Sequence, residues 1–175
     1  FDPGVFREGN MTYLYTGFCM PDDTVRKGCT VTVLAEDMLT IIREPEAIAP
    51  GLCRAKGTSF EAHAFFEAPS LRKREELYYL IYSSVYNHEL CYATGISPLG
   101  PFTFQGVIVD NCDVGIDSYK PADRKIAMHC NNHGSFTAIG DKWYMFYHRS
   151  TNGTQFSRQA CAEEIHFDEN GLIPQ

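Results

Sequence analysis

Short runs of aromatic and aliphatic residues, separated by polar turn residues, alternate along the whole chain. Three of these runs share one aromatic pattern and are centred on Tyr13, Tyr79 and Tyr144, which lie 66 and 65 residues apart. Each run is rich in strand-forming residues and follows a polar turn, so we predict that each is the second strand of a β-hairpin. No segment keeps a helical period over about 12 residues. The pattern therefore predicts an all-β protein built from a repeat.

The other strands of each unit recur as well. The expected first strands of the hairpins are 2–6, 67–71 and 132–136. Later strands are expected at 29–34 and 41, at 90–94 and 102–104, and at 159–163 and 165–167. Several antiparallel strands in a unit of this length are typical of β-propeller blades, which usually have four strands. A β-sandwich with accidental internal similarity is the alternative.

The repeats divide the 175-residue chain near 1–62, 63–128 and 129–175, which is roughly three blades. Propellers close with about four to eight blades. We therefore expect one partial propeller domain, and the missing blades of a longer parent chain are among its expected partners.

Composition excludes several kinds of partner. The net charge is −7, and the only concentrated basic residues are the three in the run Leu71-Arg72-Lys73-Arg74. Nucleic acid is not an expected partner, because phosphate binding needs a concentrated basic face. No apolar run approaches the length of about 18 residues that spans a membrane. An uncharged ligand is compatible with this chain.

The seven cysteines form no C-x-x-C pair, so a zinc ribbon or a thioredoxin-like centre is not expected. We expect them to be small, reduced residues, most of them buried. Reduced cysteines favour a cytoplasmic location, and a secreted or periplasmic location stays open. No signal-peptide pattern is visible after Phe1.

A chemically capable residue stands at the same place in each repeat. Asp2 lies 11 residues before the first aromatic centre, Glu67 lies 12 before the second, and His133 lies 11 before the third. If the repeats are blades, these side chains converge on one pocket at one end of the central axis. Simpler interpretations are a turn cap for Asp2, an ion pair of Glu67 with Arg72 or Lys73, and a core position for His133.

Two carboxyl groups in unlike surroundings at one pocket suggest cleavage of a glycosidic bond. We expect Phe65 and Phe66 to desolvate Glu67, so that it keeps its proton near neutral pH and acts as general acid. The negative charge of Asp2 is expected to raise that pKa and to orient the acid. Attack by water needs a further carboxylate, roughly 6.5–9.5 Å from the acid in an inverting enzyme.

Taken together, these motifs resemble glycoside hydrolase family 43. The matching segments follow the family's order over nearly the whole chain. They include Asp2-Pro3, Phe66-Glu67-Ala68-Pro69-Ser70, Ser97-Pro98-Leu99-Gly100-Pro101, Asn132-His133-Gly134-Ser135 and Trp143-Tyr144-Met145-Phe146-Tyr147-His148-Arg149.

The resemblance implies a five-bladed propeller of an inverting enzyme that releases arabinofuranose or xylose from plant polysaccharides or oligosaccharides. Glu67 then corresponds to the general acid, and Asp2 to the residue that tunes and positions this acid. His133 resembles a histidine of the central channel that lies, in several members, beside a bound calcium or other ion. Arg158 resembles an arginine that reaches the sugar, and Phe66 is expected to contact substrate.

One catalytic group of the family has no counterpart here. The family's general base is an aspartate in the first blade, upstream of the position that Asp2 matches. We therefore expect the base to lie outside this chain, which covers about blades two to four and the start of the last, and we expect the isolated segment to be inactive. No cofactor is expected to be required, and any calcium would be held by scattered groups and water, because no Asp-x-Asp-x-Asp-Gly loop occurs.

Two other functions fit the same pattern. A propeller without a base would bind sugar and leave it intact. A propeller that binds other proteins would have no use for aspartate, glutamate and histidine at matching positions of the repeat.

Overall fold

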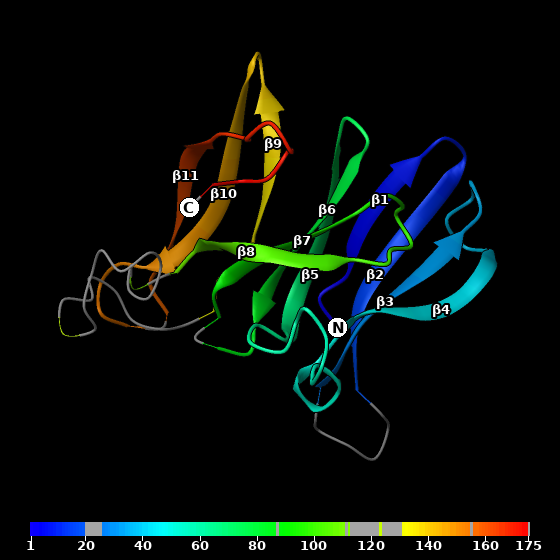
Figure 1. Ribbon diagram of the computed structural model, residues 1–175, viewed down its shortest axis with the longest axis horizontal. Coiled ribbons are helices and arrows are strands. Elements are labelled where there is room, and N and C mark those ends of the chain that lie inside the picture. The colour runs from blue at the N-terminus through cyan, green and yellow to red at the C-terminus, as the bar shows by residue number, and fades with distance from the viewer. Residues whose placement is uncertain are drawn as a thin grey trace.

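The computed structural model describes residues 1–19, 26–86, 88–110, 112, 123, 131–154 and 156–174. These residues form three antiparallel sheets and one short 3-10 helix, η1 (Leu52–Arg54) (Figure 1). The first sheet has the order β1 (Gly4–Glu8), β2 (Met11–Cys19), β3 (Arg26–Leu34), β4 (Ile41–Pro50). The second has the order β5 (Phe65–Arg74), β6 (Leu77–Ser84), β7 (Leu90–Gly95), β8 (Thr103–Val109). The third contains β9 (Gly134–Ile139), β10 (Lys142–Ser150) and β11 (Arg158–Ile165), with β10 in the middle.

The three aromatic centres occupy equivalent strands, as the repeat predicts. Tyr13 lies on β2, Tyr79 on β6 and Tyr144 on β10, and each of these is the second strand of its sheet. Each pairs with the first strand across a tight turn that contains the expected polar residues. The sheets therefore repeat one meander, and each lies within one predicted repeat. The predicted boundary near 128 and 129 lies outside the described residues.

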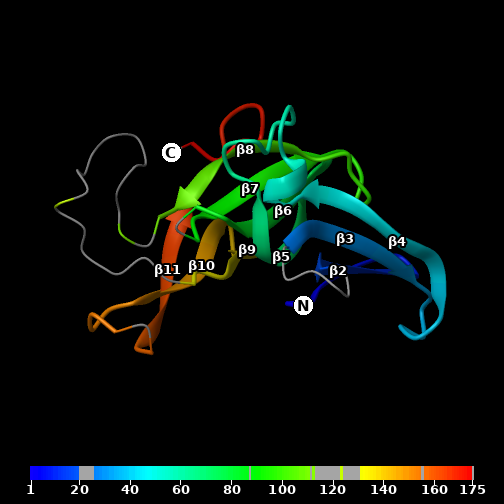
Figure 2. The ribbon, with the colours of Figure 1, turned by 90° about the horizontal axis from the view of Figure 1, so that it is seen from below.

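The three sheets are neighbouring propeller blades, and β1, β5 and β9 are their innermost strands (Figure 2). The second sheet stands between the other two, because β5 packs against both β1 and β9. Polar side chains link these strands: Ser70 Oγ lies 2.9 Å from Ser135 Oγ, and Lys73 Nζ lies 2.6 Å from Glu8 Oε1. This contact between inner strands places their first residues close together.

Alternation along β6 forms two cores, one on each side of the second sheet. Leu80 and Tyr82 face the first sheet and pack in a cluster with Tyr15 and Val31. Tyr79 and Ile81, which alternate with them along β6, belong to a second cluster that is shared with the third sheet. Its other fully buried members include Phe136 and Met145. A strand buried on both faces is the expected result of a position between two neighbouring sheets.

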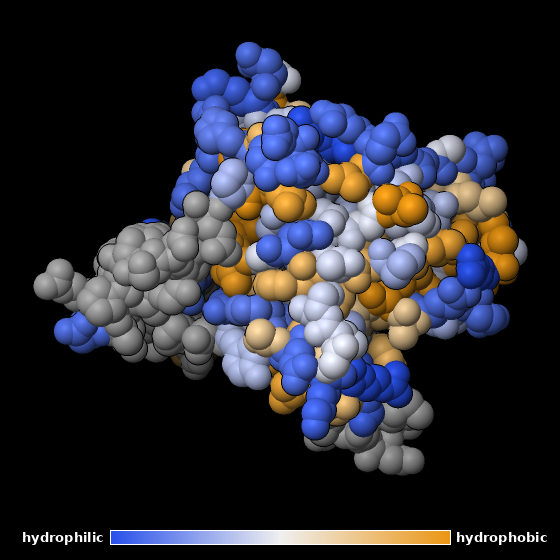
Figure 3. Space-filling model, in the orientation of Figure 1, coloured by the Kyte–Doolittle hydropathy of each residue, from blue (hydrophilic) through white to orange (hydrophobic). Residues whose placement is uncertain are grey.

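The first and third sheets have exposed outer strands, whereas the second sheet is covered on both faces by its neighbours. Nearly all of β4 and β11 is exposed, whereas β6 and β7 are almost wholly buried. Large apolar side chains are exposed on β1, β9, β10, the start of β4 and the turn before it, and orange atoms gather at the right-hand end of Figure 3, over β4 and its turn. The exposed apolar residues of the first and third sheets include Val5, Met38, Leu39, Ile41, Ile42, Ile139 and Phe146. Each outer sheet thus presents an apolar surface of the kind that covers a neighbouring blade.

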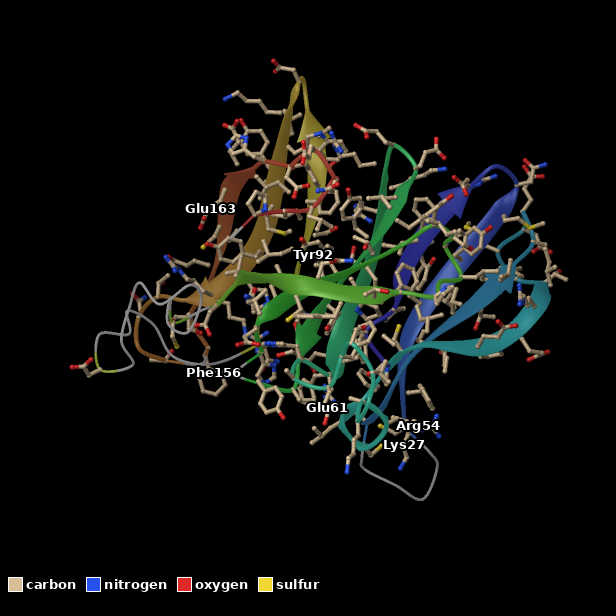
Figure 4. The ribbon with its side chains drawn as sticks, in the orientation of Figure 1. Lys27, Arg54, Glu61, Tyr92, Phe156 and Glu163 are labelled. Carbon is tan, nitrogen blue, oxygen red and sulfur yellow. The ribbon has the colours of Figure 1, made fainter. Side chains whose placement is uncertain are left out.

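The prediction of a strand at 165–167 is wrong. β11 ends at Ile165, and the third sheet has three strands in the described part of the chain. Phe167 packs instead among aromatic rings, with its centroid 5.7 Å from Tyr79 and 5.6 Å from Trp143. The segment after it returns to the second sheet, where Ile173 N donates to Tyr92 Oη at 2.9 Å (Figure 4). Burial of an aromatic ring therefore outweighs continuation of the strand.

The hydroxyl of Tyr15 makes a buried hydrogen bond between the first two sheets, donating to the carbonyl of Pro98 at 2.7 Å. We expect Tyr15→Phe to leave this carbonyl without its partner and to lower the free energy of unfolding by about 1–2 kcal/mol. Tyr86→Phe is the control, because Tyr86 is 46% exposed. Urea denaturation of the full-length protein measures both variants, and equal effects would contradict this role of Tyr15.

The six cysteines that the structure describes are free thiols, as expected, and Cys130 lies outside the described residues. The expected burial holds for only three of the six, Cys29, Cys91 and Cys112. In the described ranges, no helix has the length and apolar character needed to cross a membrane.

Candidate active site

The three predicted site residues meet where the inner strands begin. Asp2 directly precedes β1, Glu67 lies near the start of β5, and His133 directly precedes β9. One carboxylate or imidazole atom from each lies within 4.8 Å of the others. Beside them is a cleft of about 400 Å³, lined along the inner strands by Gly4, Pro69, Ser70 and Gly134, among others. The recurrence of polar residues in the repeat therefore corresponds to a real cluster.

Unusual backbone conformations surround this cluster. Asp2, Ala68 and His88 have φ of 47°, 58° and 54°, in the left-handed region that residues other than glycine rarely adopt. The pairing of β5 with β6 also shifts register between Glu67 and Ser70. Strain of this kind persists only where the surrounding structure holds it, and it gathers at functional sites. Here the irregular backbone aims Glu67 at the ends of the neighbouring blades.

Glu67 is the centre of the cluster and is only 5% exposed. Its Oε1 lies 2.9 Å from His133 Nε2 and 3.5 Å from His88 Nδ1. Its Oε2 accepts a hydrogen bond from Arg26 Nη1. Three polar side chains, one from each blade, therefore meet at one carboxylate.

The ion pair that the sequence suggested for Glu67 is wrong. Lys73 binds Glu8, and Arg72 donates instead to the carbonyls of Phe136 and Leu71, at 3.1 and 2.7 Å. Both residues follow Glu67 by at least five positions along β5, and although Arg72 lines the cleft, it directs its guanidinium to those carbonyls. The partner of Glu67 is Arg26, from the neighbouring sheet.

The structure also reverses the expected protonation of Glu67. Burial raises the pKa of this carboxyl, but the hydrogen bonds from His133 and Arg26, the approach of His88 and the charge of Arg26 outweigh it. The net pKa lies well below the ordinary value of a glutamate. The neighbouring rings of Phe65 and Phe66 do not keep the proton on Glu67, because donors reach both of its oxygens.

The spacing of Asp2 and Glu67 limits the role of Asp2. Their facing oxygens lie within 4.8 Å, too close for the water that separates acid and base in an inverting glycosidase. In the described part of the chain, Asp2 makes no hydrogen bond that would cap a turn. Its geometry suits a charge that acts on Glu67 itself.

His133 is partly open to solvent, with 35% of its side chain exposed, so it is not a core residue. Its backbone N–H donates to His148 Nε2 at 3.2 Å. Burial, with the charges of His133 and Arg158, lowers the pKa of His148, which keeps the ring neutral and able to accept. Arg158 opens β11 opposite Ser150 and is exposed at the same end of the third sheet. The structure thus places His133 in the cluster, and it relates Arg158 to the cluster only through the charge that acts on His148.

Phe66 forms one wall of a clamp around Arg26. The guanidinium carbon lies 3.6 Å from the centroid of Phe66 and 4.6 Å from that of Phe1. The imidazole ring of His88 also packs edge-on against Phe66, with the two ring centroids 4.9 Å apart. Sequence reasoning missed Arg26 and His88, because neither belongs to the repeated motif and both reach Glu67 only through folding.

The resemblance implies a calcium ion near His133, and the donors described here do not fit direct coordination. Ca²⁺ takes about six to eight oxygen ligands. The described group offers two carboxylates and one imidazole nitrogen, and both oxygens of Glu67 already accept hydrogen bonds. The neighbouring amide of Asn132 is buried without a hydrogen-bond partner, and one amide does not complete an oxygen cage. We therefore derive no step through a metal ion.

Comparison with known proteins relates this geometry to a family. The family model described as glycosyl hydrolases family 43 matches residues 1–173. A xylosidase/arabinosidase from Thermoclostridium stercorarium is 57% identical over 175 residues, which are all of this chain and 37% of that protein. A β-xylosidase from Xylanibacter ruminicola is 34% identical over 115 residues, or 65% of this chain and 31% of that protein. The chain thus spans about a third of the length of these relatives.

Solved structures show the same fold. A family 43 β-xylosidase/α-arabinofuranosidase from a compost metagenome, in complex with xylotriose and calcium-free, matches with a TM-score of 0.74 and 27% identity. The match covers 99% of this chain and 56% of that one. A Xanthomonas citri enzyme complexed with xylose matches with a TM-score of 0.75 and 26% identity, covering 99% and 55% of the two chains.

Proposed function

Because the chain belongs to glycosyl hydrolases family 43, we propose that it forms the acid-bearing part of an inverting glycosidase. The substrates are terminal or side-chain pentoses, α-L-arabinofuranose or β-D-xylose, on plant polysaccharides or oligosaccharides. One observation carries the proposal: two carboxyls and an imidazole from three successive blades converge beside an open cleft.

In this proposal Glu67 is the general acid that protonates the leaving oxygen. Because its surroundings hold its pKa below the ordinary value of a glutamate, it acts through the fraction of molecules in which it is protonated. Its surroundings hold the carboxyl in one orientation, which a proton transfer at hydrogen-bond distance requires. Asp2 lies close enough to oppose the ionisation of Glu67 and to orient it. His133, Arg158 and Phe66 supply hydrogen bonds and an apolar surface for the sugar.

The general base belongs to another part of the protein. Asp2 is too close to Glu67 to leave room for the attacking water. The relatives extend well beyond the matched segment, because this chain covers 37% and 31% of their lengths. The apolar surfaces of the two outer sheets are the surfaces on which further blades would pack.

The names of the relatives support a pentose as substrate. The two curated relatives are named xylosidase/arabinosidase and β-xylosidase, and the solved neighbours hold xylotriose and xylose. An uncharged sugar also fits a chain whose net charge is −7 and which has no concentrated basic face.

Proton NMR of the first product tests this function in the full-length protein. We expect release of xylose from xylobiose, or of arabinose from arabinofuranosyl xylo-oligosaccharides, with inversion of the anomeric configuration. Retention would contradict the proposal, because carboxyls about 5–5.5 Å apart suit a nucleophile and an acid, and Asp2 would then be the nucleophile. Binding of the sugar without release would show a non-catalytic propeller.

A further inference from the structure

Arg26 is held in the site more firmly than its partial exposure suggests. Its side chain is 30% exposed, and its guanidinium lies between the rings of Phe1 and Phe66. The same Nη1 that binds Glu67 also donates to the carbonyl of Phe66 at 3.2 Å. A planar guanidinium that stacks on two rings and binds two oxygens has little freedom to turn.

Arg26, held in this way, acts on Glu67 through its position and through its charge. Arg26 fixes Oε2, while His133 Nε2 holds Oε1 at 2.9 Å and His88 Nδ1 faces the same oxygen at 3.5 Å, so that the carboxyl plane has one orientation. It also brings a permanent positive charge to a carboxyl that is almost fully buried, and this favours the ionised form. Asp2 brings a second carboxylate within 4.8 Å of Glu67, and its negative charge favours the protonated form of Glu67.

We propose that Arg26 is a positioning residue that fixes Glu67 and opposes Asp2 in setting the pH range of the enzyme. The inference rests on the proposed role of Glu67 as general acid. A general acid must be protonated to act, so activity falls as pH rises through its pKa. A positive charge beside the acid therefore moves this alkaline limb to lower pH.

Arg26→Gln in the full-length enzyme tests the proposal, because it removes the charge and keeps a polar side chain. We expect the alkaline limb of kcat/KM to move up by about one to three pH units, the usual effect of an opposite charge at this range. Arg26→Lys keeps the charge without the planar fork, so the limb should stay near the wild-type position while kcat falls. Lys27→Gln removes the same charge from the next residue, which lines a separate hollow together with Arg54 (Figure 4), and it should leave the alkaline limb and kcat unchanged.

A second measurement separates the role of Arg26 from the role of Glu67 as general acid. Titration of selectively ¹³C-labelled glutamate carboxyls by NMR, with Glu67 assigned by its loss in Glu67→Gln, follows this carboxyl without catalysis. If its pKa does not rise in Arg26→Gln, the role of Arg26 is wrong. If its pKa rises and the kcat/KM profile does not move, Arg26 acts as proposed and Glu67 is not the acid. If activity falls equally at every pH, with the alkaline limb of kcat/KM and the pKa of Glu67 both unchanged, Arg26 has only a structural role.

Discussion

Glu67→Gln is expected to abolish most hydrolysis of natural oligosaccharides by the full-length enzyme. The amide keeps the size and planarity of the side chain, and it can still bind Arg26 and His133 through its oxygen and nitrogen. It cannot give a proton to the leaving oxygen. Since positioned proton transfer contributes about 10²–10⁴-fold, we expect kcat on xylobiose or an arabinofuranosyl oligosaccharide to fall by that factor while sugar binding survives.

A matched control lies on the same hairpin. Glu76 is exposed at the turn between β5 and β6, at the end of the hairpin away from the cluster. Glu76→Gln makes the same chemical change and should leave kcat and KM unchanged. If Glu67→Gln hydrolyses natural glycosides at the wild-type rate, Glu67 is not the general acid.

Asp2→Asn is expected to have the second largest effect. Asparagine tolerates the left-handed backbone of this position, where φ is 47°, so the change removes charge with little strain. Loss of the negative charge favours ionisation of Glu67 and loosens its orientation. We expect kcat/KM to fall by about 10²-fold, the cost of a small misplacement of a reacting group.

The pH profile gives this variant a distinct signature. Because Asp2 opposes the ionisation of Glu67, its loss should move the alkaline limb of kcat/KM to lower pH, opposite to the shift expected for Arg26→Gln. Asp141→Asn, on the exposed turn between β9 and β10, is the control and should leave the profile unchanged. An upward shift in Asp2→Asn would contradict the assigned role.

The hairpins and the cluster were predictable because both follow from local pattern and from the repeat. Aromatic runs after polar turns indicate the second strands. Asp2, Glu67 and His133 lie 11, 12 and 11 residues before Tyr13, Tyr79 and Tyr144, and this nearly constant spacing places them alike in their blades. Once three blades share one axis, their equivalent residues must meet. The spacing thus carries three-dimensional information without any long-range contact being known.

The partners of Glu67 could not be predicted in this way. Arg26 precedes Glu67 by 41 residues and reaches it from a different sheet, so no local spacing reveals the pair. His88 reaches the site from a turn with φ of 54°, a conformation that its sequence does not announce. Because these donors were missed, the expected rise in the pKa of Glu67 was wrong.

The dependence of Glu67→Gln on the leaving group tests the central claim most directly. An aryl glycoside such as 2,4-dinitrophenyl β-D-xyloside needs little protonation of its leaving oxygen, whereas xylobiose needs it fully. If Glu67 is the general acid, kcat/KM of the variant relative to wild type falls at least about 100-fold further on xylobiose than on the aryl xyloside. Equal losses on the two substrates would contradict the account, because Glu67 would then support the fold or the sugar and not the transfer of a proton.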